Sequence, residues 1–143
     1  MLRGAQAVFL EEHRNAPVLL DSEHAIDAMV DALIVADPLH NAAQLVSLDR
    51  QMFSSDMPDH IFLVGVSAGG QSGILSYSTG EEGALIPAGE ATAPLAIYML
   101  NTHPREFLEP TEVPIDLVRQ AVKEFVLSGG RRPTCLEWRE EPY

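Results

Sequence analysis

The sequence predicts an α+β fold: a twisted antiparallel β-sheet of about five or six strands, with two amphipathic helices packed on one face. Short apolar runs separated by glycine-rich turns indicate the strands and favour a meander. Two longer stretches repeat apolar residues every three or four positions, as helices with one buried face do. A chain of 143 residues is expected to form one domain, here residues 1–143.

The clearer helix pattern runs from Pro114 to about Ser128. Its apolar face consists of Ile115, Val118, Val122, Phe125 and Val126. Proline suits the first helical turn, and Gly129-Gly130 supplies a residue for the left-handed conformation that often ends a helix. Alternation over residues 134–138 then predicts a strand, so the unit is helix, tight turn and strand.

The other helix is predicted to begin after Asp21 or Ser22 and to end at Asp37-Pro38. Its apolar face consists of Ile26, Met29, Val30, Leu33 and Ile34. A first strand is expected over about residues 5–11, and Val18-Leu19-Leu20 forms a short apolar lead into the helix. Acidic residues in the first half of the helix suit the positive end of its dipole.

The middle of the chain predicts a hairpin between residues 61–66 and 74–79, with further strands at 84–87 and 95–100. His103-Pro104 is predicted to be a turn before the second helix. If both helices cover one face of the sheet, the other face is expected to carry Ser76 and Ser78 and to be open to solvent or a partner.

Residues 39–59 have no clear periodicity, because polar side chains interrupt every apolar run. This stretch is either a short helix over residues 42–45 followed by a long loop, which would then be a candidate interface region, or a strand around residues 45–52.

The second half of the chain contains a recognisable series of short motifs. They are His103-Pro104, Glu106-Phe107, Val113-Pro114, residues 121–125, Gly129 or Gly130 and residues 132–138, with a weaker match at 73–77. This series resembles the C-terminal signature of the Imm1 immunity proteins. The resemblance implies a bacterial protein that binds and neutralises a toxin, often one of the deaminase superfamily. The matched residues are of core, turn and helix-cap types, so no catalytic site comes with the resemblance.

Charge is the strongest signal in the composition. Nine basic and 21 acidic residues give a net charge of −12, which repels nucleic acid and anionic membranes and favours basic partners. Many cytoplasmic proteins are acidic simply for solubility, so the charge permits a basic partner without demonstrating one. Acidic residues in expected loops and turns are therefore the candidate partner-binding residues: Asp56, Asp59, Glu81 and Glu82.

Gly65-Val66-Ser67-Ala68-Gly69 has the G-x-S-x-G form of a hydrolase nucleophile elbow. That elbow needs a helix after the serine, whereas a strand is predicted here. The same glycine-rich stretch lacks the lysine of a phosphate-binding loop, and the five histidines are scattered. The sequence therefore predicts no catalytic residue, no cofactor and no metal site.

Cys135 is the only cysteine and cannot form an intramolecular disulfide. Its predicted strand position favours a small buried side chain. No apolar run is long enough to span a membrane, and the N-terminus is too short and acidic for a secretory signal. A cytoplasmic location is expected.

The sequence thus predicts a cytoplasmic, non-enzymatic immunity protein whose partner is a basic cognate toxin. The protein is expected to inhibit that toxin by binding to it rather than by catalysis. The alternative is a regulatory domain that binds a small molecule or a peptide on the open face of the sheet.

Overall fold

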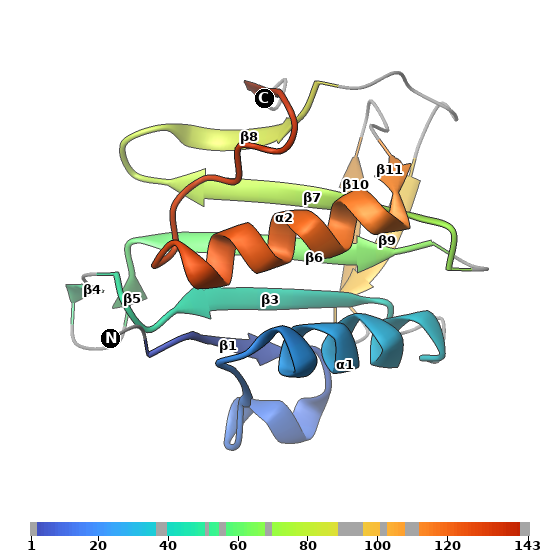
Figure 1. The fold of residues 1–143 in the computed structure, drawn as a ribbon, viewed down its shortest axis with the longest axis horizontal. Coiled ribbons are helices and arrows are strands. Elements are labelled where there is room, and N and C mark those ends of the chain that lie inside the picture. Colours follow the sequence, from blue (N-terminus) through green and yellow to red (C-terminus); the bar gives the residue numbers. More distant parts are fainter. Residues whose placement is uncertain are drawn as a thin grey trace.

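A computed structural model describes residues 3–36, 40–50, 52–54, 57–67, 70–88, 96–100, 103–107 and 112–140. The described chain is a twisted sheet with two helices on one face, as predicted (Figure 1). Within the described residues the main sheet has 10 strands, more than the five or six expected.

The longest path through the sheet follows the strand order β10-β9-β3-β6-β7-β8-β12. The bounds of these strands are His103–Phe107, Ala96–Leu100, Ala42–Ser47, His60–Val66, Ser72–Thr79, Gly83–Pro87 and Trp138–Glu140, in the same order. Strand β1 (Ala5–Val8) pairs with β3 and with β2 (Val18–Leu20), and β11 (Val113–Pro114) pairs with β7. Strands β4 (Met52–Ser54) and β5 (Met57–Pro58) form a separate pair.

Both predicted helices are present. Helix α1 (Glu23–Ile34) follows the short 3-10 helix η1 (Glu11–Arg14) and β2. The Ser22 side chain caps α1 by accepting a hydrogen bond from the backbone N–H of Ala25 at 3.1 Å. Helix α2 (Ile115–Leu127) begins directly after Pro114 and is followed by two glycines with positive φ, Gly129 and Gly130.

One core lies between the helices and the sheet. Alternate residues of the central strands face the helices, as the cross-strand pairs Phe62↔Tyr77 and Val64↔Leu75 show. Phe125 of α2 is fully buried, and its ring centroid lies 4.7 Å from that of Phe62. Aromatic packing of this kind fixes α2 against the middle of the sheet.

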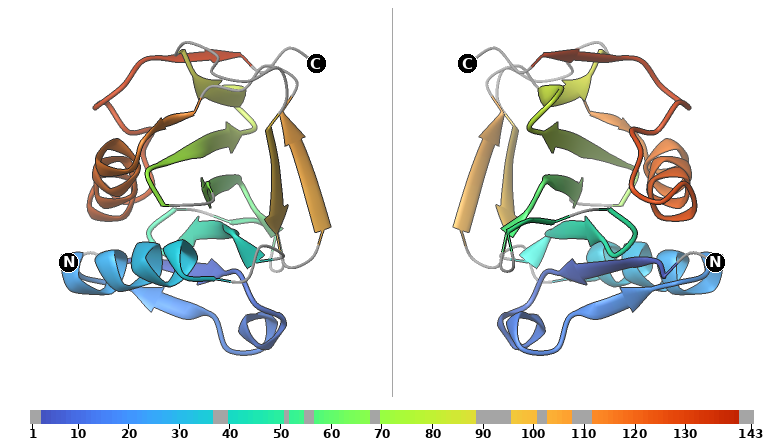
Figure 2. Two further views of the ribbon diagram at one scale, coloured as in Figure 1. Left: turned by 90° about the vertical axis from the view of Figure 1, so that its right-hand side faces the viewer. Right: turned by 90° about the vertical axis from the view of Figure 1, so that its left-hand side faces the viewer.

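The second face of the sheet is not open, contrary to the sequence prediction. Ser76 is 2% exposed and Ser78 is half-buried, and Ile74 and Ile86 on the same face are also buried. Figure 2 shows the β9–β10 hairpin on the side of the sheet away from α2. Strand β9 joins β3 through the parallel pair Ala42↔Leu100. The face expected to receive a ligand or peptide is therefore covered by the chain itself.

Of the alternatives for residues 39–59, the strand is confirmed in part: β3 lies in the middle of the sheet, but it begins before residue 45 and replaces the short helix considered at residues 42–45. Two other local predictions were wrong. His103-Pro104 begins β10, an edge strand, where the missing N–H of proline is tolerated. Residues 134–137 are bent rather than extended, since the Glu124 carboxylate accepts the backbone N–H groups of Thr134 and Cys135, both at 3.1 Å.

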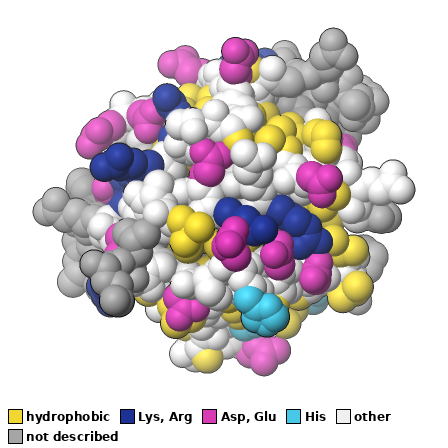
Figure 3. Space-filling model, viewed as in Figure 1, with side chains coloured by type: hydrophobic (Ala, Val, Ile, Leu, Met, Phe, Trp, Pro, Cys, Tyr) yellow, Lys and Arg dark blue, Asp and Glu magenta, His cyan; other side chains and the backbone are white. Residues whose placement is uncertain are grey.

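Ion pairs join the outer sides of the two helices. Arg119 of α2 contacts Asp27 and Asp31 of α1, and Lys123 contacts Asp27 at 3.3 Å. In Figure 3 the basic side chains at the centre of this face lie directly beside acidic ones. Burial opposes ionisation of Asp27, but the bonds from Lys123 and Arg119 outweigh it and lower its pKa. Arg119 and Lys123 are therefore already paired with carboxylates of the protein itself.

Replacing Phe125 by alanine tests the position of the core. Phe125→Ala should lower the free energy of unfolding by about 3–5 kcal/mol, because it leaves a cavity against Phe62 and Tyr77. Leu127→Ala on the same helix is the control and should cost below about 1 kcal/mol, since Leu127 is 46% exposed. Urea unfolding measures both, and similar losses for the two variants would contradict this assignment of the core.

Candidate functional site

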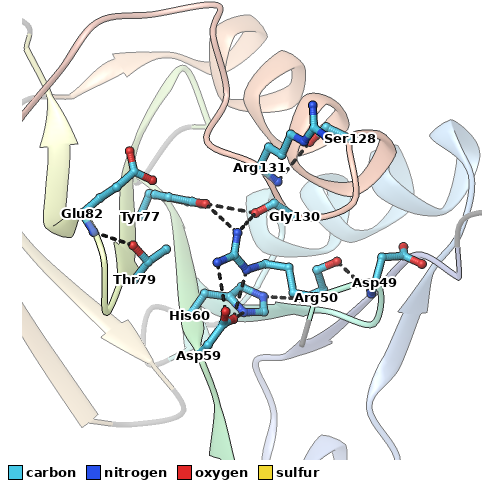
Figure 4. Close-up of polar contacts among 11 residues, drawn as sticks. Asp49, Arg50, Asp59, His60, Tyr77, Thr79, Glu82, Ser128, Gly130 and Arg131 are labelled. Carbon is cyan, nitrogen blue, oxygen red and sulfur yellow. Dashed lines mark hydrogen bonds and ion pairs between the residues drawn. The ribbon is translucent and has the colours of Figure 1, made fainter. Parts of the chain in front are cut away.

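A network of polar side chains joins four segments at one end of the sheet (Figure 4). At its centre is His60, the first residue of β6, which is 3% exposed. Its Nε2 accepts the backbone N–H of Ser47 at 2.8 Å, and its Nδ1 lies 2.7 Å from Oδ1 of Asp59. Because Nε2 is the acceptor, Nδ1 carries the proton and donates it to Asp59. The network therefore fixes a neutral histidine in one tautomer.

Arg50 binds the Asp59 carboxylate with two hydrogen bonds, from Nε and from Nη2, both at 3.0 Å. These bonds, supported by the one from His60, hold the pKa of Asp59 below its usual value. Asp59 in turn raises the pKa of Arg50. A bidentate ion pair between partly buried groups is stronger than an exposed ion pair. The pair therefore stays charged and connects the turn after β3 to the start of β6.

The carbonyl of Gly130 closes the network from the far end of the chain. It accepts hydrogen bonds from Arg50 Nη1 at 3.2 Å and from the Tyr77 hydroxyl at 3.0 Å. Gly130 has a φ of +90°, and an added Cβ would lie 2.6 Å from both Ser47 Cβ and Arg50 Cδ. A positive φ and this close approach both favour glycine here, so the network depends on a residue in the turn that follows α2.

Three of the four predicted partner-binding residues meet at this end of the sheet. The pair His60↔Thr79 places Asp59 beside the β7–β8 turn, which carries Glu81 and Glu82. Glu81 is exposed, whereas Glu82 forms an ion pair with Arg132. Asp59 is engaged with Arg50 and His60. Asp56 lies outside the described residues. Asp59 thus has a structural role that the sequence did not reveal.

A groove of about 550 Å³ lies nearby, between α1, α2 and the segment Arg131–Glu137, which we call the arm. Its lining residues are Glu23, Gln120, Lys123, Glu124, Leu127, Ser128, Arg131, Arg132 and Thr134. A second hollow of about 440 Å³ shares Arg132 and Thr134 with it and continues along the arm to Trp138. No sequence pattern indicated the groove, because its walls come from segments about 100 residues apart.

The Ser67 motif does not form a nucleophile elbow. The next described element is strand β7 rather than a helix, and Ser67 Oγ donates to the carbonyl of Ser72 at 2.8 Å. Cys135 is half-buried, and burial, reinforced by Glu124, raises its pKa to about 12. Its thiol is therefore a poor nucleophile at neutral pH.

No group of three or more His, Cys, Asp or Glu side chains that could hold a metal ion occurs among the described residues. None of the helices in the described part of the chain is long and apolar enough to cross a membrane.

The structure combines a packed sheet, a partly buried charged network and two surface hollows. The family model of the immunity protein Imm1 matches residues 14–140, so the chain belongs to the Imm1 family. The family implies an immunity protein that acts against a toxin. No curated protein matches the sequence. The family match extends well beyond the second half of the chain, where the resemblance was first apparent.

Gly130 gives a test of the network. Gly130→Ala should destabilise the protein more than Gly83→Ala, because both glycines have positive φ but only Gly130 would also collide with neighbouring side chains. We expect a loss of about 1–2 kcal/mol for Gly83→Ala and about 1–3 kcal/mol more for Gly130→Ala. Denaturant unfolding of both variants provides the comparison, and equal losses would show that the close approach at Gly130 is unimportant.

The neutral state of His60 predicts a pH dependence of stability. Burial holds its pKa below 6.5 in the folded protein, so the unfolded chain binds a proton at a higher pH than the folded one. Stability should therefore fall as the pH drops below about 6.5 and level off below the folded-state pKa.

His60→Gln should be less stable than the parent at pH 7 but should show a flatter dependence between pH 7 and 5.5. His24→Gln is the matched control, because His24 is exposed on α1. Urea unfolding at several pH values measures the slopes. A His60→Gln slope equal to that of the parent would rule out His60 as the group responsible.

Proposed function

We propose that this immunity protein neutralises a toxin of the deaminase superfamily by covering the toxin's basic, nucleic-acid-binding face with its own acidic surface. The observation that carries the proposal is the way in which the charges are distributed. Four basic side chains are occupied by acidic partners inside the protein: Arg50, Arg119, Lys123 and Arg132. Exposed acidic residues without an ion pair among the described residues are Glu12, Asp21, Glu23, Glu81, Asp116, Glu137 and Glu140.

The edge of the sheet formed by β8 and β12 concentrates part of this negative charge. Glu81 and Glu82 lie in the turn that leads into β8, and Glu140 pairs with Leu85 of β8. Glu137 immediately precedes β12. In Figure 3 acidic side chains gather along the upper margin of the molecule. We propose that Glu81 and Glu82 contact the toxin directly, while Asp59 supports their turn from within the network.

A toxin that deaminates bases in nucleic acid must hold a polyanion, so its substrate face is expected to be basic. An acidic protein can cover that face without any catalytic residue. A standard interface of about 1,600 Å² in total is enough for a specific complex. An acidic surface that covers a basic substrate face explains why the partner is a toxin that binds nucleic acid. It also explains the excess of exposed carboxylates and inhibition by binding alone.

The proposal is tested by capture followed by inhibition. The immobilised protein is exposed to lysate of its own organism at low salt, and the bound toxin is identified and its toxic domain purified. Deamination of single-stranded DNA and RNA by that domain is then measured with increasing amounts of the immunity protein. Activity should fall to zero at one equivalent. A captured toxin with another chemistry, or a deaminase that stays active at one equivalent, would contradict the proposal.

Charge removal at the edge tests how the complex forms. A triple variant with Glu81→Gln, Glu137→Gln and Glu140→Gln should associate with the toxin several-fold more slowly at low salt, with little change in the dissociation rate. The control carries Glu12→Gln, Asp21→Asn and Asp116→Asn, which remove equal charge elsewhere on the surface. Stopped-flow or biosensor association rates decide between them. Equal slowing in both variants would mean that net charge acts without a defined acidic contact surface.

A further inference from the structure

We propose that the groove between α2 and the arm receives a segment of the toxin that carries a carboxylate, and that Arg131 binds this carboxylate. The proposal rests on the proposed function, because it supposes a toxin as the partner. It adds a contact whose charge is opposite to that of the acidic edge.

Arg131 is the groove-lining cation whose side chain has no hydrogen-bond or ion-pair partner among the described residues. Within the described residues its guanidinium makes no hydrogen bond or ion pair, and only its backbone N–H is used, by Ser128 Oγ at 3.1 Å. The two other cations of the lining have partners, since Lys123 contacts Asp27 and Arg132 contacts Glu82. A guanidinium presents a fork of donors that matches a carboxylate. Arg131 is therefore available to an outside acceptor.

The acceptors of the groove wall are largely used up. Glu124 receives three hydrogen bonds, from the backbone N–H and hydroxyl of Thr134 and from the N–H of Cys135. The Ser128 hydroxyl donates to the carbonyl of Phe125 at 3.3 Å. Glu23 remains, but it lies on the α1 side, where it disfavours a second carboxylate and leaves the arm side for it. Near the arm, the Glu124 carboxylate and the Ser128 hydroxyl thus already have partners, whereas the Arg131 guanidinium remains available as a donor.

Local charge and exposed apolar surface support a protein segment as the occupant. The lining has one cation without an ion pair among the described residues, Arg131, so a carboxylate has one defined place to bind in a protein of net charge −12. Leu127, 46% exposed, gives the groove an apolar contact point that a free anion would not use. The groove also adjoins the proposed toxin-binding edge through the Arg132–Glu82 ion pair. One toxin can therefore contact both.

Charge reversal at Arg131 separates this contact from general electrostatic attraction. Arg131→Glu makes the protein more acidic, so long-range attraction alone would speed its association with a basic toxin. We expect the opposite: binding about tenfold or more weaker, with the change mainly in the dissociation rate. Arg3→Glu makes the same change in net charge outside the groove lining and should bind at least as tightly as the parent.

The experiment uses the toxin domain recovered by capture, inactivated at its active site, and measures both rate constants for the parent and the variants. Leu127→Ala should also weaken binding, by about threefold or more. Urea midpoints and circular dichroism check that each variant is folded. Should Arg131→Glu fail to fold, Arg131→Gln serves in its place, with a smaller loss expected.

Each outcome is decisive. Parent-like or tighter binding by the Arg131 variants overturns the groove contact and leaves the proposed function standing. Failure of the parent to bind any toxin overturns both. If sedimentation shows that Arg131→Glu separates a dimer of this chain while toxin binding is unchanged, the groove receives a second copy and the proposal is wrong.

Discussion

The bidentate ion pair between Arg50 and Asp59 is the interaction on which the structure of one end of the sheet depends. It joins the turn after β3 to the start of β6, and the same guanidinium reaches the carbonyl at the end of α2. His60 extends this network to β3 by accepting a hydrogen bond from the backbone N–H of Ser47. Because the charged groups are partly buried, losing one partner leaves the other in a poorly solvated site. The end of α2, and with it the start of the arm, is thereby held against the sheet.

This arrangement separates the residues that maintain the fold from those that face outward. Asp59 is used by the network, whereas Glu81 in the adjacent turn is exposed. Arg50 is likewise bonded within the network, whereas the side chain of Arg131, one residue beyond Gly130, makes no hydrogen bond or ion pair among the described residues. Asp59 and Arg50 thus maintain the fold, whereas Glu81 and Arg131, which carry the same charges, face outward. Their positions in the fold decide these roles, and the sequence alone does not distinguish them.

The sequence predicted the elements with strong local patterns and missed contacts between distant residues. The amphipathic spacing in α1 and α2 and the turn glycines between β6, β7 and β8 were sufficient to predict those elements. Strand β3 was ambiguous because Gln44 and Ser47 break its apolar run, and β10 was missed because Pro104 indicates a turn. The network was unpredictable, since Arg50 and Gly130 are 80 residues apart.

The exposed position of the groove residues has a consequence for divergence within the family. Replacing Arg131 or Leu127 removes little buried surface, so such changes cost little stability. Changes at Gly130, Asp59 or Phe125 are costly, because Gly130 and Phe125 are buried and Asp59 is bonded to Arg50 and His60. Under the proposed groove contact, selection for a new toxin would act on the arm and the exposed side of α2 while the underlying scaffold stays constant. Immunity specificity would then change in single substitutions, without an intermediate that fails to fold.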